Sequence, residues 1–303
     1  MFVIDKLWPI FAQTVLPVFL VAGAGFMLAG FFPIDSRSVG RLLFYLATPA
    51  LVFRSLYQTE LSAGVLGRLA LVAVTAAVLT GTIGWLISAG RDRNTRAAVV
   101  LTSAVSNNGN MGIPISFFAF GDAGAALATI YYVVMSFMSN TFGAAVASSG
   151  RATLGDALRA SLRVPVLYAA SVGILLNLSH TALPTSLARS VDLTASAAIP
   201  VMLLLLGVHL RAAPLFAAQG IVLQSVAVRL LASPAIAWAL CLAIGIGGVE
   251  RNVLVLQAAM PTAVMTAVLA TEFDTAPQMV ATVIFLSTAA SMVTLSAVLW
   301  VLM

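Results

Sequence analysis

The chain has 303 residues, of which 61% are hydrophobic and only 8% are charged, and its mean hydropathy is +1.07. About a quarter of the residues in an ordinary soluble domain are charged, so this composition excludes a soluble globular protein and predicts one that lies in a bilayer. The formal net charge is +5. The basic residues are scattered along the chain, as in membrane proteins, which argues against a nucleic-acid partner.

Rare residue types exclude several kinds of chemistry. Cys241 is the only cysteine, and His180 and His209 lie far apart, so neither a disulfide framework nor a thiolate metal site is expected. Lys6 is the only lysine, which rules out a phosphate-binding loop of the G-x-x-x-x-G-K-[ST] type. We therefore expect no cofactor and no ATP-driven step within this chain. Any work that it performs must draw on solute or ion gradients.

Hydropathy predicts ten apolar spans, most of them close to the length of about 20 residues that crosses a bilayer as a helix. Little of the chain remains for connections, so no large soluble domain is expected. The predicted spans cover residues 10–32, 42–57, 69–90, 98–120, 123–147, 164–179, 193–210, 222–247, 252–271 and 277–301.

Two basic residues near or within these spans need an interpretation. Lys6 precedes the first span, as in a secretory signal, but the stretch from Ile10 to Phe32 is longer than a usual signal core, so we expect this span to be retained. Arg229 lies within the eighth span. We expect its side chain to reach the membrane interface, which is a common arrangement for arginine near the end of a span.

The remaining basic residues predict the orientation of the chain. Nine fall on one side of the membrane and five on the other when Arg229 is left aside, and the positive-inside rule makes the richer side cytoplasmic. Both termini then face outward. The longest connection, residues 148–163, lies inside.

The fourth span contains residues that a continuous lipid-facing helix avoids. Its segment Ser106–Pro114 holds three asparagines, two glycines and a proline at the expected depth of the bilayer. Pro114 removes a backbone donor, and the glycines permit a non-helical path. Freed peptide groups are tolerated at this depth only inside protein or beside a water-filled cavity. We therefore expect the helix to break here and the break to face the interior.

The ninth span carries a similar interruption, which includes Gln257 and Pro261. Prolines also mark the second and seventh spans, at Pro49 and Pro200, and the two members of each pair of prolines are separated by about half the chain. This spacing predicts two repeats of five spans, and because five is odd the repeats must be inverted. We expect an all-α polytopic membrane protein with ten transmembrane helices, in which residues 1–150 and 151–303 form the repeats and helices 4 and 9 are broken.

Several segments resemble the auxin efflux carrier family of membrane transporters. They are Leu43–Pro49, Asn107–Pro114, Ile199–Gly207, Gln257–Pro261 and Ala270–Phe273. The resemblance covers essentially the whole chain, and its two interrupted helices are the most specific part. It implies that broken helices 4 and 9 cross at their prolines. It also implies a scaffold of helices 1, 2, 6 and 7, a mobile transport unit of helices 3–5 and 8–10, and a homodimer formed through the scaffold.

The short connection between the halves differs from the long cytoplasmic loop of many plant auxin carriers. In this respect the chain looks like a compact bacterial member of the family, whose relatives carry small carboxylates such as malate or malonate. The resemblance then implies a multi-pass protein of the bacterial inner membrane. Together with the charge count, it predicts that both termini are periplasmic.

The inferred topology independently favours an anionic solute. Each second half-helix begins near the midplane, where Pro114 and Pro261 suit a first helical turn. Two convergent helix N-termini supply about +0.5 charge apiece, which provides a site for a carboxylate without lysine or arginine. Side-chain amides can donate to carboxylate oxygens or instead cap the half-helices, and by the resemblance Asn107 occupies the position of a substrate-contacting asparagine. The candidate substrate-binding residues are Asn107, Asn108, Asn110, Gly112, Pro114, Gln257, Met260, Pro261 and Thr262.

The sequence leaves open which ion, if any, is coupled to transport. The acidic residues Asp122, Glu272 and Asp274 fall at the ends of the broken spans, where solvated loop acids are a plainer interpretation than proton carriers. Coupling to H+, coupling to Na+ and no coupling ion remain as alternatives.

These features predict a secondary transporter of small organic anions, mono- or dicarboxylates, with elevator-type alternating access. A channel or a solute sensor on the same scaffold is the alternative. An intramembrane hydrolase has less support, because the Gly121-Asp122 pair lacks a partner aspartate in another span and neither G-x-S-x-G nor H-E-x-x-H occurs. We therefore expect no enzymatic activity.

Overall fold

The computed structural model describes residues 7–59, 62–148, 155, 159, 162–213 and 220–303. Regular secondary structure in this part of the chain is helical, apart from one isolated backbone bridge. The all-helical prediction is therefore confirmed for the described residues. Seven helical segments there are long and apolar enough to cross a membrane.

The helices of the first half follow the predicted spans closely, and five-residue π-helical turns, written η, interrupt several of them. In chain order the elements are η1 (Phe11–Val15), α2 (Leu16–Phe31), α3 (Ser36–Leu42), η2 (Leu43–Ala47), α4 (Thr48–Gln58), α5 (Ala63–Ile87), α6 (Arg93–Ala104), η3 (Asn108–Gly112), α7 (Ile113–Met138), η4 (Ser139–Gly143) and α8 (Ala144–Ala147).

The described residues of the second half have the same helical character, with one π turn. Its elements are α10 (Pro165–Leu178), α11 (Thr185–Ala212), α12 (Gly220–Ala227), η5 (Val228–Ala232), α13 (Ser233–Ala243), α14 (Gly248–Ala258), α15 (Met265–Glu272) and α16 (Pro277–Leu302).

The seven long segments and the ten predicted spans differ for identifiable reasons. The helical run Asn108–Ala147 includes the second part of the predicted fourth span and all of the fifth. The predicted sixth span corresponds to α10, which has only 14 residues. The predicted ninth span is divided between α14 and α15, with residues 259–264 between them outside helical structure.

Prolines within the spans follow π turns in a repeated pattern. The turns η1, η2, η3 and η5 each end two residues before a proline, namely Pro17, Pro49, Pro114 and Pro234. Proline lacks an N–H, and its ring clashes with the carbonyl four residues earlier in a regular α-helix. A wider turn just before the proline relieves this clash. The chain can therefore continue as a helix through these four prolines.

Glycine reverses the chain inside α7. Gly121 has φ of 65°, a conformation that side chains with a Cβ rarely adopt. A Cβ added at Gly124 would lie 2.5 Å from the carbonyl oxygen of Ser116, whereas eight residues of a continuous helix would span about 12 Å. The part of α7 before Gly121 therefore folds back against the part that follows it, and the predicted fourth and fifth spans meet at this turn.

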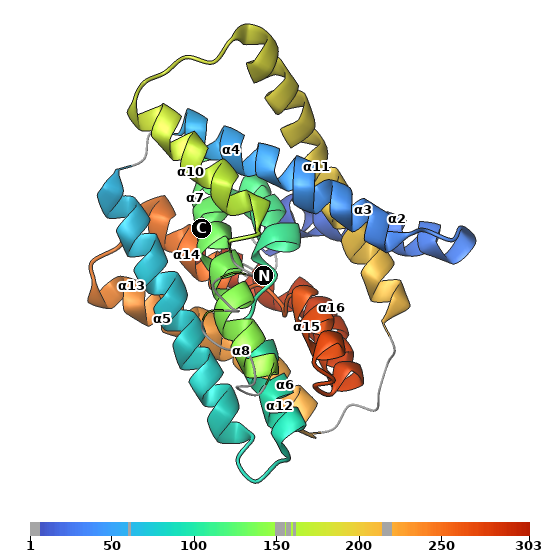
Figure 1. Cartoon of the computed structure of the whole chain (residues 1–303). Helices are drawn as coiled ribbons and strands as arrows, with labels where there is room; N and C mark the ends of the chain where they lie inside the picture. Colours follow the sequence, from blue (N-terminus) through green and yellow to red (C-terminus); the bar gives the residue numbers. More distant parts are fainter. Residues whose placement is uncertain (1–6, 60–61, 149–154, 156–158, 160–161, 214–219) are drawn as a thin grey trace.

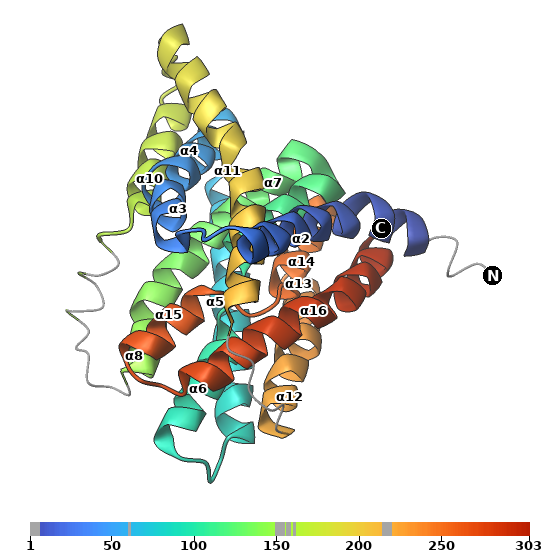
Figure 2. The ribbon, with the colours of Figure 1, turned by 90° about the vertical axis from the view of Figure 1, so that its right-hand side faces the viewer.

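The helices form two packed groups (Figures 1 and 2). In one group α2 packs against α11, and α4 packs against both α10 and α11. The α2–α11 contact is a backbone contact, because a Cβ added at Gly25 or Gly207 would overlap a carbonyl group of the facing helix. The second group is built from α5, α6 and α12–α16, and α7 connects the groups through its contacts with α4 and α14.

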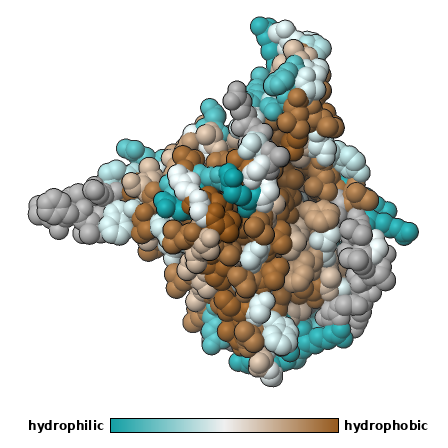
Figure 3. All heavy atoms as spheres, turned by 90° about the vertical axis from the view of Figure 1, so that its left-hand side faces the viewer, coloured by the Kyte–Doolittle hydropathy of each residue, from teal (hydrophilic) through white to brown (hydrophobic). Residues whose placement is uncertain are grey.

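Apolar side chains dominate the outer surface. Figure 3 shows one face on which hydrophobic residues cover most of the middle, while hydrophilic residues gather toward its margins. Large exposed hydrophobic side chains include Leu20, Phe31, Leu71 and Val293. In water so much exposed apolar area would be unfavourable, and in a bilayer it faces lipid.

Candidate functional site

The two interrupted helices cross through a short antiparallel backbone pairing. The N–H of Asn107 donates to the carbonyl of Pro261 at 2.7 Å, and the N–H of Ala263 donates to the carbonyl of Val105 at 3.0 Å. Backbone groups that an interruption frees are costly inside a bilayer unless the protein pairs them. Each interruption therefore supplies hydrogen-bond partners for the other.

The centre of this pairing is the bridge between Ser106 and Thr262. Thr262 also ties the two elements together with its side chain, because its hydroxyl donates to the carbonyl of Thr102 near the end of α6 at 2.8 Å. Its own N–H donates to the hydroxyl of Ser287 in α16 at 3.2 Å. Thr262 is fully buried, and both its hydroxyl and its N–H are engaged by protein.

A pair of buried amides clamps the crossing. The Asn108 side chain donates from Nδ2 to both the carbonyl and Oε1 of Gln257, each at 2.9 Å. Gln257 in turn donates from Nε2 to the hydroxyl of Ser116 at 2.9 Å. A Cβ at Gly112 would overlap the Gln257 side chain, so glycine is required for this approach. The amide groups of Gln257 are thus occupied by contacts within the protein.

A small cavity of about 170 Å³ lies beside the crossing, and polar residues form part of its wall. This is the room of about five or six water molecules in the liquid, and it is smaller than pockets for drug-sized ligands. Among the described residues, no charged side chain lines the wall. Its lining residues are Phe44, Val105, Ser106, Asn107, Asn108, Gly109, Asn110, Tyr132, Met135, Ser136, Ser139, Asn140, Ala263, Val264 and Met265.

Asn107 lines this cavity and carries a side-chain donor without a hydrogen-bond partner in the described part of the chain. Its side chain is only 4% exposed, and its Nδ2 has no hydrogen-bond partner among the described residues. The backbone of Asn107 is occupied, because its N–H bonds to Pro261 and its carbonyl accepts from Gly112 at 3.0 Å. Buried polar groups without a partner are rare in folded proteins and often belong to functional sites. This amide is therefore a candidate for binding a solute beside the cavity.

Two helix N-termini add positive potential at the same cavity. The helical run that starts at Asn108 exposes its first turn through Gly109 and Asn110, and α15 begins at Val264 and Met265. The first N–H groups of a helix lack partners within the helix and carry about +0.5 charge in total. Two such ends together supply about one positive charge. The cavity is therefore suited to a carboxylate, although no basic side chain lines it.

The sequence of this chain is similar to those of known membrane transporters. A family described as "Membrane transport protein" matches residues 10–152 and 148–299. The chain belongs to the auxin efflux carrier family. Membership makes it a membrane transporter and not an enzyme.

Relatives from archaea and plants have similar sequences. An uncharacterized transporter from Methanothermobacter thermautotrophicus is 29% identical over 93% of this chain and 95% of its own length. One from Methanocaldococcus jannaschii is 25% identical over 88% of this chain and 90% of its own length. A probable auxin efflux carrier component from Oryza sativa is 30% identical over 42% of this chain and 24% of its own length. The archaeal relatives therefore match along nearly the whole chain.

Only the three asparagines among the residues predicted to bind substrate line the cavity of this family member. The other six lie in the packing around the crossing. Gln257 forms the amide clamp with Asn108, Gly112 leaves room for the Gln257 side chain, and Pro261 and Thr262 take part in the backbone pairing. The two remaining predicted residues are Met260, which is fully buried in the hydrophobic core, and Pro114, which is buried near the start of α7.

The position of the first interruption differs from the prediction. The non-helical residues are 105–107, and the helix resumes at Asn108, so Pro114 lies inside a helical run and not at the break. The π turn η3 accommodates Pro114, with the N–H of Ile113 bonding to the carbonyl of Asn108 five residues earlier. In the second interruption Pro261 lies within the break, as predicted.

A polar face on the predicted fifth span was not predicted from the sequence. Tyr132, Ser136, Ser139 and Asn140 all line the cavity. Ser136 follows Tyr132 by four residues, and Ser139 and Asn140 follow Ser136 by three and four, which places them on one side of a helix. This spacing was visible in the sequence, and it is the signal that would have identified the facing wall.

The interpretation of Arg229 was wrong. Its side chain is 1% exposed, and it points into the protein and not toward the membrane interface. Its guanidinium donates from Nη1 to the carbonyl of Ser103 at 2.7 Å and from Nη2 to the carbonyl of Ala258 at 2.6 Å. These carbonyls lie at the ends of α6 and α14, so the two interrupted helices together provide the acceptors that allow an arginine to be buried.

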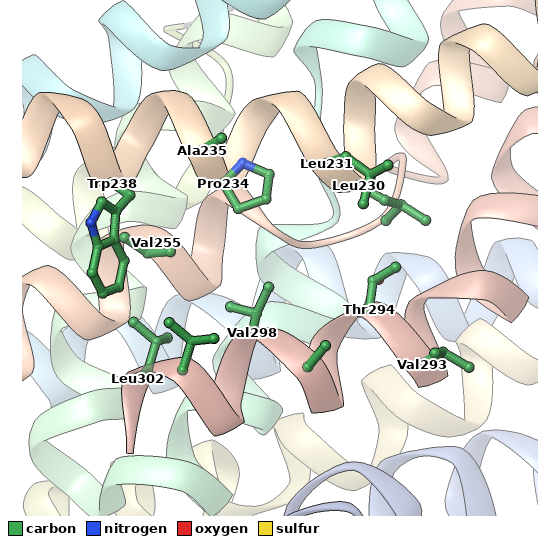
Figure 4. A pocket seen from close by; sticks show the side chains of 12 residues that line it. Leu230, Leu231, Pro234, Ala235, Trp238, Val255, Val293, Thr294, Val298 and Leu302 are labelled. Carbon is green, nitrogen blue, oxygen red and sulfur yellow. The ribbon is translucent and has the colours of Figure 1, made fainter. Parts of the chain in front are cut away.

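Two other cavities have features that suit an anion less well. The cavity of about 770 Å³ between α4, α7 and α11 is lined by one basic residue, Arg54, and by two acidic residues, Asp122 and Asp192. The net charge of its lining side chains is therefore negative, which disfavours an anion. An apolar groove between α13 and α16 has Thr294 as its one hydroxyl-bearing side chain among the described residues (Figure 4). Neither wall matches a carboxylate as well as the cavity at the crossing.

Proposed function

We propose that this protein is a secondary transporter of small organic anions, mono- or dicarboxylates, and that the anion binds in the cavity beside the crossing. The observation that carries the proposal is the unpartnered amide of Asn107, buried next to two helix N-termini. A carboxylate would accept from this amide and from N–H groups of the first helical turns other than those of Asn108, Thr266 and Ala267, which donate to backbone carbonyls. The small volume of the cavity favours a solute of few heavy atoms.

The proposed architecture is ten transmembrane helices in two inverted repeats, residues 1–150 and 151–303. The two ranges matched by the family, 10–152 and 148–299, meet near the middle of the chain and support this division. The interrupted elements also fall one in each range. In this proposal α10 and the pairs of half-helices count as spans alongside the long helical segments.

The proposed mechanism is elevator-type alternating access. The group of α2, α4, α10 and α11 would act as a scaffold, and the group that contains the crossing would move against it as a body. The backbone contacts between α2 and α11 support a rigid scaffold. Phe44 lines the cavity from the scaffold side, so the proposed solute site lies where the two groups meet.

The remaining parts of the proposal concern the cellular setting. The protein would reside in the bacterial inner membrane with both termini periplasmic, and it would form a homodimer through the scaffold helices. The excess of basic residues on one side of the predicted topology supports the orientation.

Flux measurements in proteoliposomes test the proposed function. Purified protein is reconstituted, and uptake of labelled acetate, malonate and malate is measured with and without the same unlabelled acid inside. We expect saturable uptake that internal substrate accelerates, because a carrier must return its site. Flux that rises linearly with concentration would indicate a channel, and absence of flux for all small carboxylates would refute the proposal.

A further inference from the structure

Arg229 connects the C-terminal ends of both broken helices. Beyond the bonds to Ser103 and Ala258, its Nη1 lies 3.3 Å from the carbonyl of Ala104, the last residue of α6. Its Nη2 also contacts the hydroxyl of Ser233 one turn along its own helix. With Thr262 bound to the carbonyl of Thr102, the last three carbonyls of α6 all have side-chain donors.

The positive charge of the Arg229 guanidinium balances the partial negative charges of the two helix C-termini at the crossing. Each helix C-terminus carries about −0.5 charge, so the ends of α6 and α14 together present about one negative charge. The guanidinium supplies one positive charge at that point and has no carboxylate partner among the hydrogen bonds and ion pairs of the described residues. The N-terminal ends, which face the cavity, keep their positive potential free for an anion.

In transporters with broken helices, the C-terminal ends and unwound carbonyls of the half-helices are where a coupling Na+ or H+ is held. Here that position contains a side chain that keeps its proton at physiological pH. The oxygen atoms that a sodium ion would need, on Ser103, Ala104 and Ala258, already accept from Arg229.

We propose that Arg229 is a built-in cation that replaces a coupling ion at the crossing, so that this protein moves its anion without binding Na+ there. Arg229 is a positioning residue: it holds the ends of α6 and α14 together, and through them the two N-termini that face the solute. The inference rests on the proposed function in one respect, because it takes the crossing as the solute site.

Thermal unfolding of the purified protein tests this inference without a known substrate. Wild-type protein is melted in NaCl and in choline chloride at equal ionic strength, and we expect the same midpoint in both salts. A higher midpoint in NaCl that reports a bound Na+ would overturn the proposal, whichever solute is carried.

The variant Arg229→Ser tests whether the buried cation itself stabilises the crossing. Removal of the buried cation should lower the midpoint by about 10 °C, and 10 mM guanidinium chloride should restore part of this loss by occupying the vacated carbonyl ends. Arg229→Lys should melt between the two. Arg251→Ser is the matched control, since Arg251 stacks over Trp238 at 4.7 Å and reaches neither helix end, and guanidinium should not stabilise it.

Flux completes the test. In proteoliposomes that show carboxylate uptake, replacement of Na+ by choline should change the wild-type rate by less than about twofold, whereas a loss of tenfold or more would overturn the proposal. If no carboxylate is taken up, the proposed function fails, and the melting comparison still decides the role of Arg229. If the variant Arg229→Ser folds but guanidinium does not raise its unfolding midpoint, that result would also contradict the proposed role of Arg229.

Discussion

The substitution Asn107→Ala removes the unpartnered amide without removing any hydrogen bond that holds the crossing. The bonds that Asn107 makes there come from its backbone, to Pro261 and from Gly112. A hydrogen bond to a charged group contributes about 1.5–3 kcal/mol. Since each 1.4 kcal/mol is about a tenfold change in affinity, we expect carboxylate binding to weaken by about 10- to 100-fold while the unfolding midpoint changes little.

The assay is half-saturation of carboxylate uptake in proteoliposomes, with the amount of inserted protein measured in parallel. Asn108→Ala is the informative control, because the Asn108 side chain donates two bonds to Gln257 and accepts one from Ser106. That variant should lose thermal stability as well as transport. If Asn107→Ala binds carboxylate within twofold of the wild type, Asn107 does not contact the solute and the proposed site is wrong.

Three further predictions concern stability, each measured as the unfolding midpoint in detergent. Thr262→Val leaves a carbonyl at the end of α6 unpaired and should lower the free energy of unfolding by about 1–3 kcal/mol. The hydroxyl of Thr266 bonds only within its own turn, so Thr266→Val should lower it by less. Equal losses in the two variants would contradict the role of Thr262. Gly207→Ala should destabilise the packing of α2 on α11, unlike Gly67→Ala, which faces open space. Hydrogen bonds from Thr95 hold the pKa of Asp92 below its usual range. The stability that Asp92 confers should therefore be complete above about pH 4 and disappear as the pH falls through the lowered pKa. Asp92→Ala should abolish that part of the acid sensitivity, and an unchanged pH profile of the unfolding midpoint would refute the assignment.

The sequence predicted the existence of both interruptions because they depend on local chemistry. Proline and glycine alter the backbone wherever they occur, and Pro261 lies in the second break as expected. The first break was misplaced because Pro114 is compatible with a helix that widens just before it. Four prolines in this chain follow such π turns, so a proline in a span predicts a local distortion more reliably than a break.

The role of Arg229 could not be predicted from its neighbours in the chain. Hydropathy shows a charge inside an apolar span, but the carbonyls that stabilise it belong to residues 126 and 29 positions away. Only the crossing brings these groups together. The relevant signal was indirect, since two half-helices that end in the interior must leave carbonyls that need donors.

The cavity shows the same division between local and distant information. Asn107, Asn108 and Asn110 were identified because they lie inside an apolar span. Gln257 has the same chemistry, yet its amide is used by Asn108 and Ser116. Which of two buried amides stays free for a ligand depends on partners from other helices. Sequence alone therefore indicated the region of the site, and the packing distinguishes the residues that face the cavity from those that brace it.

An experimental density map of the protein with a bound small carboxylate would test the central claim most directly. We predict density in the cavity beside the crossing, with a carboxylate oxygen within hydrogen-bond distance of Asn107 Nδ2 and of an N–H group in the first turn of the helix that begins at Asn108 or at Met265. Density for the solute in the larger cavity beside Arg54 and Asp122, with the cavity at Asn107 filled only by water, would contradict it.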